Sequence, residues 1–307
     1  MGSVQNPAPK EVSPVNELPR LICFDLDGTV YTPGRRRLTP RVRRAFARCH
    51  GAGAIPCVVS GRQIQMIDRA LLAEPWLDAL ITINGAASYL DDRQTPVHAY
   101  PLPAERCLAL MDAVADLSPL WMLLTLEGAY EQQGFMGYMS QPVVGPRSAA
   151  RHLAREAKHK LEVLAGRSPV HSVESIRPLI EAGTLTPAKL NLKCRTDAEY
   201  AEALGRIRDF EGLEVVDMGY SEAEITVAGA NKGRAIDELR RLLGIELEDS
   251  VMFGDSSNDL PALGHVGTFV AVENAAPSVK DRAQEICPSV YQDGVAQWLE
   301  QHLDARG

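Results

Sequence analysis

The sequence lacks long apolar runs, paired cysteines and an excess of basic charge. No run of about 18 apolar residues occurs, so no transmembrane helix and no membrane partner are expected. None of the six cysteines forms a CxxC pair, so they predict buried, reduced thiols rather than a metal-thiolate site. We therefore expect a reducing, cytoplasmic compartment. The net charge of -8 argues against nucleic-acid binding, which needs a basic surface.

Other absences narrow the interpretation further. Residues 1–20 contain four prolines and no apolar segment, and they predict a flexible tail rather than a signal peptide. The chain has no internal repeat, and its histidines fall in no ligand spacing. The remaining composition, with 45% hydrophobic and 23% charged residues among 307, is that of an ordinary globular protein of one or two domains.

Apolar strands alternate with amphipathic helices at both ends of the chain. Residues 21–24 are apolar without alternation, as in a parallel strand that is covered on both faces. Thr39 and Pro40 predict a helix start, and Gly51 predicts its end. The alternation predicts an α/β fold with a doubly wound parallel sheet.

The middle of the chain has a different, mixed pattern. Residues 86–227 contain several short strand and helix signals, and the alternation resumes after them. We therefore predict a core domain from 21–85 and 228–302, with an α+β module inserted at 86–227 as a cap.

Polar residues follow the predicted core strands at the points where those strands end. Because the carboxyl ends of parallel strands meet at one edge of a sheet, these residues should converge. They are Asp25 and Asp27, then Ser60, Gly61 and Arg62, then Asn84 and Gly85, and finally Gly254, Asp255, Asn258 and Asp259. Clustered carboxylates favour a hard cation such as Mg²⁺, which substrate phosphate often helps to ligate.

Two of these aspartates lie two positions apart, so in extended chain their side chains point the same way. One of Asp25 and Asp27 can bind metal and act as a nucleophile, while the other transfers a proton. Lys232, at the start of a predicted helix, can contact a phosphate oxygen. Ser60 and the backbone amides that follow it can donate hydrogen bonds to the same group.

A calcium loop of the EF-hand type is excluded. Such a loop needs glycine at its sixth position and glutamate at its twelfth. Counted from Asp25, these positions hold Val30 and Arg36; counted from Asp255, they hold Leu260 and Val266.

The motifs FDLDGT, VVSGR, NKG and GDSSND, in this order, resemble the haloacid dehalogenase (HAD) superfamily. The long insert between the second and third motifs resembles the C2-capped, type IIB (Cof-type) phosphatases. The resemblance spans about residues 21 to 300. It implies a Rossmann-like core domain with an inserted α+β cap.

The resemblance also implies the catalytic roles. Asp25 would attack phosphorus and form an aspartyl-phosphate, and Asp27 would protonate the leaving oxygen and later deprotonate water. Ser60 and Lys232, helped by Asn258, would hold the transferring phosphoryl group.

The remaining predicted roles concern the metal and the substrate. Mg²⁺ would be bound by Asp25, Asp255 and the backbone carbonyl of Asp27, with Asp259 binding directly or through water. Gly61 and Arg62, which follow Ser60, are predicted to contact phosphate or substrate, although for Arg62 a structural ion pair is an equal alternative.

These features predict a Mg²⁺-dependent phosphohydrolase for a small phosphorylated metabolite, with sugar phosphates as the leading class by resemblance. A cap would exclude water and screen substrates by size, which argues against macromolecular substrates. Two alternatives stay open: a sugar phosphomutase of the same fold, and a non-catalytic protein that binds phosphometabolites.

Overall fold

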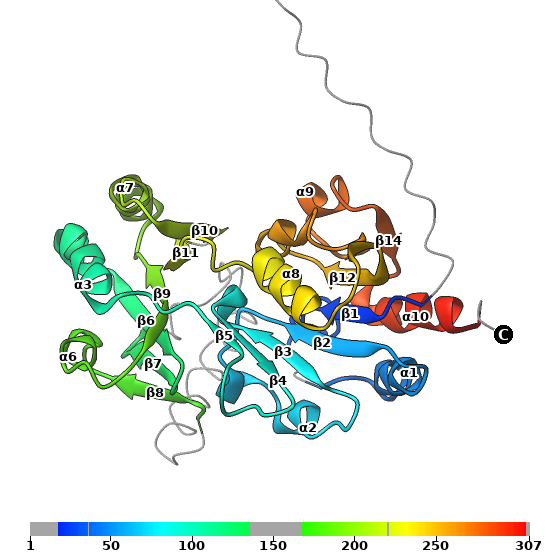
Figure 1. Cartoon of the computed structure of the whole chain (residues 1–307). Helices are drawn as coiled ribbons and strands as arrows, with labels where there is room; N and C mark the ends of the chain where they lie inside the picture. Colours follow the sequence, from blue (N-terminus) through cyan, green and yellow to red (C-terminus); the bar gives the residue numbers. More distant parts are fainter. Residues whose placement is uncertain (1–17, 36, 136–167, 220, 305–307) are drawn as a thin grey trace, which may run out of the picture.

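The structure, a computed structural model, describes residues 18–35, 37–135, 168–219 and 221–304. These residues form two β-sheets with their own helices (Figure 1). Residues 1–17 of the predicted tail lie outside the described residues, and Leu18 is buried in the core. Within the described part of the chain, no helix is both long and apolar enough to cross a membrane.

The larger sheet forms the core domain. Its strand order is β14-β13-β12-β1-β2-β3-β4-β5, and all neighbours from β14 to β3 run parallel. Strand β1 is fully buried in the middle, as its unbroken apolar run predicts. The eight strands are β1 (Leu21–Phe24), β2 (Ile55–Val59), β3 (Ala79–Thr82), β4 (Ala87–Leu90), β5 (His98–Ala99), β12 (Ser250–Gly254), β13 (Thr268–Val272) and β14 (Glu285–Cys287).

The helices of the core domain begin and end where local signals predict. The Thr39 side chain accepts a hydrogen bond from the backbone N–H of Val42 and caps α1, and the Asn231 side chain caps α8 in the same way. The core helices are α1 (Pro40–Gly51), α2 (Arg69–Leu72), α8 (Lys232–Leu242), α9 (Pro277–Lys280) and α10 (Gly294–Asp304).

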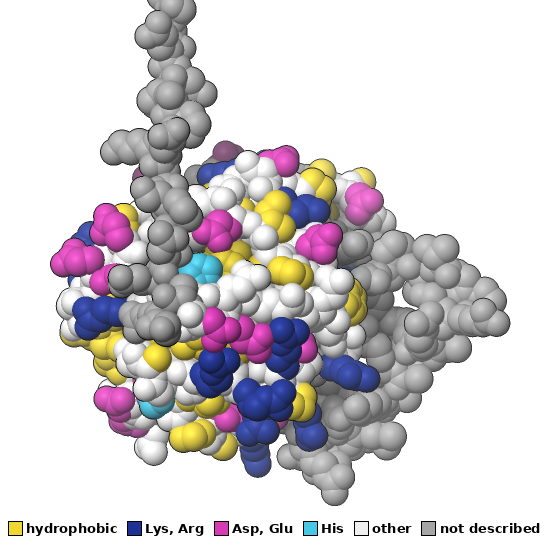
Figure 2. All heavy atoms as spheres, turned by 90° about the vertical axis from the view of Figure 1, so that its right-hand side faces the viewer, with side chains coloured by type: hydrophobic (Ala, Val, Ile, Leu, Met, Phe, Trp, Pro, Cys, Tyr) yellow, Lys and Arg dark blue, Asp and Glu magenta, His cyan; other side chains and the backbone are white. Residues whose placement is uncertain are grey.

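One outer face of the core domain is formed by α1 and α10, which pack against each other. Ion pairs join them at the surface, from Arg41 to Glu300 at 2.6 Å and from Arg48 to Asp304 at 3.2 Å. Figure 2, which views the molecule from the right-hand side of Figure 1, shows basic and acidic side chains interspersed with scattered hydrophobic ones. Such interspersed surface charges are typical of a solvated face.

The smaller sheet forms the cap domain, with the strand order β10-β11-β9-β6-β7-β8. Its strands are β6 (Leu120–Thr125), β7 (Ala129–Gln132), β8 (Val170–Val173), β9 (Pro187–Lys193), β10 (Leu213–Gly219) and β11 (Glu222–Val227). Its helices are α3 (Ala104–Ala113), α6 (Arg177–Glu181) and α7 (Asp197–Arg208), which lie along the outer, left-hand side in Figure 1.

The two faces of the cap sheet differ in character. Leu190 and Leu192 of β9 pack with the helices in an apolar cluster. The alternate residues Lys189, Asn191 and Lys193 lie on the other face, as the period of two in a strand requires. This polar face is directed toward the core domain, because Lys189 bonds to a core residue.

The first predicted domain boundary differs from the structure. The sequence assigns residues 86–227 to the cap, but β4 and β5 pair antiparallel with β3 in the core sheet. The chain therefore reaches the cap sheet only after Ala99. The mixed pattern at this point marks two short antiparallel strands at the edge of the core sheet.

An apolar cluster joins the two domains. Ile83 and Ala86 of the core pack with Met122, Leu124 and Ala188 of the cap. The Gln65 side chain also donates to the backbone carbonyl of Glu127 at 2.8 Å. The cap is thus docked onto the core edge at which the strands end.

Candidate active site

The first two site carboxylates lie where β1 ends. The backbone N–H of Asp25 donates to the carbonyl of Phe253 at 3.0 Å, which fixes Asp25 beside the end of β12. The chain then turns sharply at Gly28, whose φ is +87°. A Cβ at this position would lie 2.2 Å from Oδ2 of Asp255, so only glycine lets the loop pass this carboxylate.

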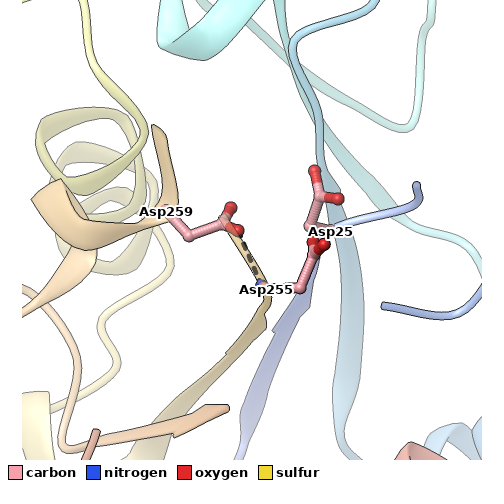
Figure 3. Close-up of side chains that lie close together, drawn as sticks. All are labelled: Asp25, Asp255 and Asp259. Atoms are coloured by element: carbon pink, nitrogen blue, oxygen red, sulfur yellow. Dashed lines mark hydrogen bonds between the residues drawn. The ribbon is translucent and has the colours of Figure 1, made fainter. Parts of the chain in front are cut away.

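Three carboxylates converge at this edge of the sheet (Figure 3). Asp25 from β1 and Asp255 from the end of β12 lie side by side, and Asp259 reaches toward them from the following 3₁₀ helix (Ser257–Ala262). Each offers an oxygen, and these oxygens all lie within 4.8 Å of one another. The convergence expected at the strand ends is therefore present.

Asp259 is held rigidly. Its Oδ2 accepts hydrogen bonds from the backbone N–H groups of Asp255 and Ser256, at 2.9 and 3.0 Å. Its side chain is fully buried. Thr29 donates to Oδ1 of Asp255 at 3.0 Å, so this second carboxylate is also fixed in orientation.

Lys232, the first residue of α8, links two of the carboxylates. Its Nζ donates to Oδ1 of Asp25 at 2.7 Å and to Oδ1 of Asp259 at 2.6 Å. Asn258 also lies near this ammonium, with 3.4 Å between Nζ and the amide oxygen. Lys232 is fully buried. Burial alone lowers the pKa of the ammonium, but the carboxylates of Asp25 and Asp259 raise it above its usual value.

The charges of the cluster do not balance. Three carboxylates face one ammonium, so the cluster carries an excess of two negative charges when all three carboxylates are ionised. Burial and then the neighbouring carboxylates raise the pKa of Asp255 to about 7. The pKa of Asp25 is also raised well above its usual value by burial, with Lys232 acting in the opposite direction.

This donor set fits a divalent cation. Carboxylate oxygens are the ligands that hard cations such as Mg²⁺ prefer, and two positive charges would offset the two excess negative charges. Asp25, Asp255 and Asp259 could therefore hold such an ion. Asp27 is not part of this cluster, and the assignment of its backbone carbonyl to the metal stays a prediction.

Arg62 holds the second aspartate of the motif. Its Nε donates to Oδ2 of Asp27 at 2.7 Å and its Nη2 donates to Oδ1 at 2.6 Å, a bidentate pair. Its Nη1 donates to the carbonyl of Met66 at 3.0 Å. The Asp27 side chain is 57% exposed, and Arg62 covers it from one side. The ion pair, one of the two predicted roles of Arg62, is present, and contact between Arg62 and substrate stays a prediction.

Ser60 and Gly61 lie in the loop that follows β2. Ser60 is buried, its backbone N–H donates to Ile81 in β3, and its Oγ accepts from the backbone N–H of Arg62 at 3.3 Å. The side chain of Asn258 bridges this part of the site, because its amide N–H₂ donates to Oδ1 of Asn84 at 3.3 Å. Hydrogen bonds thus lead from Lys232 through Asn258 and Asn84 to Ser60.

Several contacts of the site were not assigned from the sequence. Thr29 belongs to the FDLDGT motif, which is the signal that could have identified it. Asn84 was noted at a strand end but given no role. Lys189 and Glu224 of the cap were missed, although a lysine between apolar residues of a buried strand is an unusual pattern.

One groove of the described surface does not include the clustered carboxylates in its lining. Its volume is about 1510 Å³, and it is lined by core residues such as Thr32 and Met66 and by cap residues such as His171. None of the three clustered aspartates lines it. The candidate site is therefore identified by its cluster of carboxylates and not by the volume of a groove.

Comparisons with known proteins agree with this geometry. A family model described as haloacid dehalogenase-like hydrolase matches residues 22–299. The chain is 26% identical to the pyridoxal phosphate phosphatase YbhA of Escherichia coli (strain K12), over 92% of this chain and 98% of that protein. It is 29% identical to an HMP-PP phosphatase of Enterobacter sp. (strain 638), over 85% of this chain and 86% of that protein.

The fold has solved relatives. One is a sugar phosphatase of HAD subclass IIB, with a TM-score of 0.72 and 22% identity, covering 93% of this chain and 99% of that one. This likeness confirms the predicted fold, a Rossmann-like core with an inserted cap. Together with the family match over nearly the whole described chain, it leads to one assignment: this chain belongs to the haloacid dehalogenase-like hydrolases, as the order of its motifs predicts.

Proposed function

We propose that the chain is a Mg²⁺-dependent phosphatase that hydrolyses a small phosphorylated metabolite through an aspartyl-phosphate. The observation that carries this proposal is the cluster of Asp25, Asp255 and Asp259 around Lys232, with ligand oxygens within 4.8 Å and an excess of two negative charges. Phosphoryl transfer needs mainly positioning and charge neutralisation, and this site supplies both.

In the first step, a carboxylate oxygen of Asp25 forms a bond to phosphorus while the bond from phosphorus to the leaving oxygen breaks. Asp27 enters this step protonated, which requires its carboxyl group to release one of the two hydrogen bonds from Arg62, and it gives this proton to the leaving oxygen. In the second step, Asp27 takes a proton from water, whose oxygen attacks phosphorus and releases Asp25 and inorganic phosphate. Both aspartates return to their starting states.

The other residues hold charge and position. Lys232 and the hydrogen-bond donors of Ser60 and Asn258 would hold the phosphoryl oxygens. Arg62 orients Asp27 through its two hydrogen bonds. A Mg²⁺ ion held by Asp25, Asp255 and Asp259 would supply electrostatic stabilisation of the transferring group.

The substrate class follows from the cap and from the relatives. The docked cap favours substrates that fit between the two domains rather than macromolecules. The relatives that match over most of the chain are named for pyridoxal phosphate and HMP-PP. These two compounds and common sugar phosphates are therefore the first substrates to test.

The test is the release of inorganic phosphate from this panel, with Mg²⁺ and with EDTA. The wild-type protein is compared with Asp25→Asn and with a matched control, Asp281→Asn, an exposed aspartate of the core domain. We expect metal-dependent release that Asp25→Asn reduces by at least about a thousandfold and that the control retains.

Two results would contradict the proposal. The first is full activity in EDTA or in Asp25→Asn. The second is the absence of phosphate release from every substrate by folded protein with Mg²⁺. In the second case, a product that keeps the phosphoryl group would identify a mutase, and tight binding without turnover would identify a binding protein.

A further inference from the structure

The turn after β3 contacts through its backbone the loop of residues 60–62, which we call the phosphate-binding loop after its proposed role. Ile83, Asn84 and Gly85 all have positive φ, at 53°, 57° and 97°. The backbone N–H of Ile83 donates to the carbonyl of Arg62 at 2.9 Å, and that of Asn84 donates to the carbonyl of Ser60 at 3.1 Å. A β-branched residue such as Ile83 rarely adopts this conformation, so its surroundings must hold it there.

The same turn also contacts the part of the core that carries Lys232. A Cβ at Gly85 would lie 2.3 Å from the carbonyl oxygen of Asn231, so the turn packs directly against the start of α8. The Asn84 side chain accepts a hydrogen bond from Asn258, whose own amide oxygen lies beside the Lys232 ammonium. Asn84 therefore lies between the phosphate-binding loop and the catalytic lysine.

The cap reaches this turn through one buried ion pair. Lys189 of β9 donates to Oε1 of Glu224 on β11 at 2.6 Å and to the carbonyl of Gly61 at 2.9 Å. The Asn84 amide donates to Oε2 of the same glutamate. Lys189 is 1% exposed and Glu224 is 9% exposed. Two cap side chains thus bond directly to the phosphate-binding loop and to the turn that supports it.

The contacts of Glu224 favour its ionised form. Burial raises the pKa of Glu224, but Lys189 and the hydrogen bonds from Asn84 and Asn191 together lower it by more than burial raises it. The pKa of Glu224 therefore lies below its usual value. Burying two charges costs free energy that their attraction only partly offsets, so such a pair is a weak source of stability. Because this pair also bonds to Gly61 and Asn84 of the core domain, a role in positioning those residues fits it better.

We infer that Lys189 and Glu224 are positioning residues: with the cap docked, they hold Gly61 and Asn84, and through them the phosphate-binding loop and Asn258, in the geometry for phosphoryl transfer. This inference rests on the proposed phosphatase reaction. In this inference, the two cap residues position the groups that bind the transferred phosphoryl group, and they do not recognise the leaving group.

The two roles predict different kinetics. A residue that recognises the leaving group alters KM for its own substrate and leaves an unrelated phosphoester unaffected. A residue that positions the phosphate-binding loop alters kcat for every substrate, because all substrates share the phosphoryl group.

The experiment compares Glu224→Gln, Lys189→Met and Asn84→Gly, of which the last keeps the backbone free to adopt positive φ. Glu222→Gln is the matched control, because Glu222 lies two residues away on β11 and has its own ion pair with Lys193 at 3.5 Å but no hydrogen bond to a described core residue. Steady-state kinetics are measured with the best metabolite and with p-nitrophenyl phosphate.

We expect each of the three variants to lower kcat by about 10- to 100-fold on both substrates, and the control to lower neither. Hydrogen exchange supplies a second readout that needs no turnover. Amides in residues 60–63 and 83–86 should exchange faster in the three variants than in the wild type and in Glu222→Gln, while core strand β1 stays protected.

Several outcomes would overturn the inference. They are a change in KM for the metabolite alone, an equal effect of Glu222→Gln, or a lower melting temperature with unchanged kcat and unchanged exchange in the two segments. If the wild type releases no phosphate, the proposed function fails, and the exchange data still decide whether the cap pair orders the loop. The Lys189→Met/Glu224→Gln double variant, which buries no unpaired charge, replaces any single variant that does not fold.

Discussion

At the scale of single residues, the contact between Arg62 and Asp27 links the second motif to the first. The guanidinium fixes both carboxylate oxygens at 2.6 and 2.7 Å and is itself anchored on the carbonyl of Met66. Lysine cannot reproduce a bidentate pair, because its ammonium is a single point charge. The orientation of the proposed acid and base therefore depends on arginine at this position.

The first prediction follows from this contact. Arg62→Lys should lower kcat by about 10- to 100-fold, within the range that general acid and base catalysis contributes, and it should change the shape of the pH–rate profile. The control is Arg43→Lys on α1, whose exposed side chain pairs with Glu74 away from the site. An unchanged profile in Arg62→Lys would show that Asp27 needs no such support.

The second prediction concerns Gly28. Gly28→Ala would place a Cβ 2.2 Å from Oδ2 of Asp255 at a φ of +87°, so the carboxylate must move. We expect activity to fall by at least about 100-fold and stability by about 1 kcal/mol or more. Gly34→Ala is a matched control, because its φ is +84° but nothing lies within 4 Å of the added Cβ. Equal activity losses in the two variants would contradict a role for crowding at Asp255.

At the scale of elements, strands β9 and β11 of the cap differ from ordinary half-buried strands. The face of these strands that is directed toward the core carries buried lysine, asparagine and glutamate side chains instead of apolar ones. This face contacts the core through Lys189 and Glu224. This face makes the stability of the protein depend on pH in a defined direction.

The third prediction is that pH dependence. Because Lys189 lowers the pKa of Glu224 below its usual value of 4.5, the pair stabilises the fold above that pH. This contribution of the pair to the free energy of unfolding is lost as the pH falls through the lower pKa that Glu224 has in the folded protein. The difference in free energy of unfolding between wild type and Glu224→Gln, measured by urea from about pH 7 to pH 3, should be constant at neutral pH and shrink below about 4.5. A difference that grows on acidification would contradict a charged pair.

Local signals predicted some elements well and others poorly. Thr39 and Pro40 set the start of α1, and the residues on its buried face, which follow helical spacing, are Val42, Ala45, Phe46 and Cys49. On α8 the helical spacing from Ile236 and Leu239 would place Leu242 on the buried face, but Leu242 is 54% exposed. The helix ends at that residue, and Ile245 takes the buried position in the following loop instead. Periodicity cannot locate such an end within one turn.

At the scale of the whole molecule, the motifs predicted that the carboxylates of Asp25, Asp255 and Asp259 meet, because a parallel sheet gathers its carboxyl ends at one edge. Asp25 and Asp255 are 230 positions apart in sequence but lie on neighbouring strands β1 and β12. The contacts between domains could not be predicted in the same way. The pairing of Lys189 with Glu224 and their approach to Gly61 depend on the strand order of the cap and on how it docks, which no local pattern specifies.

The fourth prediction concerns the metal and the stability of the whole fold. A divalent cation that binds the folded carboxylate cluster should raise the melting temperature, and saturation at about 100 times Kd corresponds to about 2.7 kcal/mol. We expect this rise with millimolar Mg²⁺ in the wild type and its loss in Asp255→Asn. A thermal shift of equal size in both proteins would contradict the assignment of Asp255 as a ligand.

The central claim is that Asp25 is the nucleophile, and the most direct test is to trap its phosphorylated form. The Asp27→Asn variant, which lacks the proposed base for the second step, is mixed with Mg²⁺ and p-nitrophenyl phosphate, whose leaving group needs no proton from Asp27 in the first step, and quenched rapidly in acid. Mass spectrometry of the digested protein should then show one added phosphoryl group on the peptide that contains Asp25, and none when Asp25 is replaced by asparagine. Turnover without a phosphorylated peptide at any quench time, or phosphorylation at a different residue, would contradict the account.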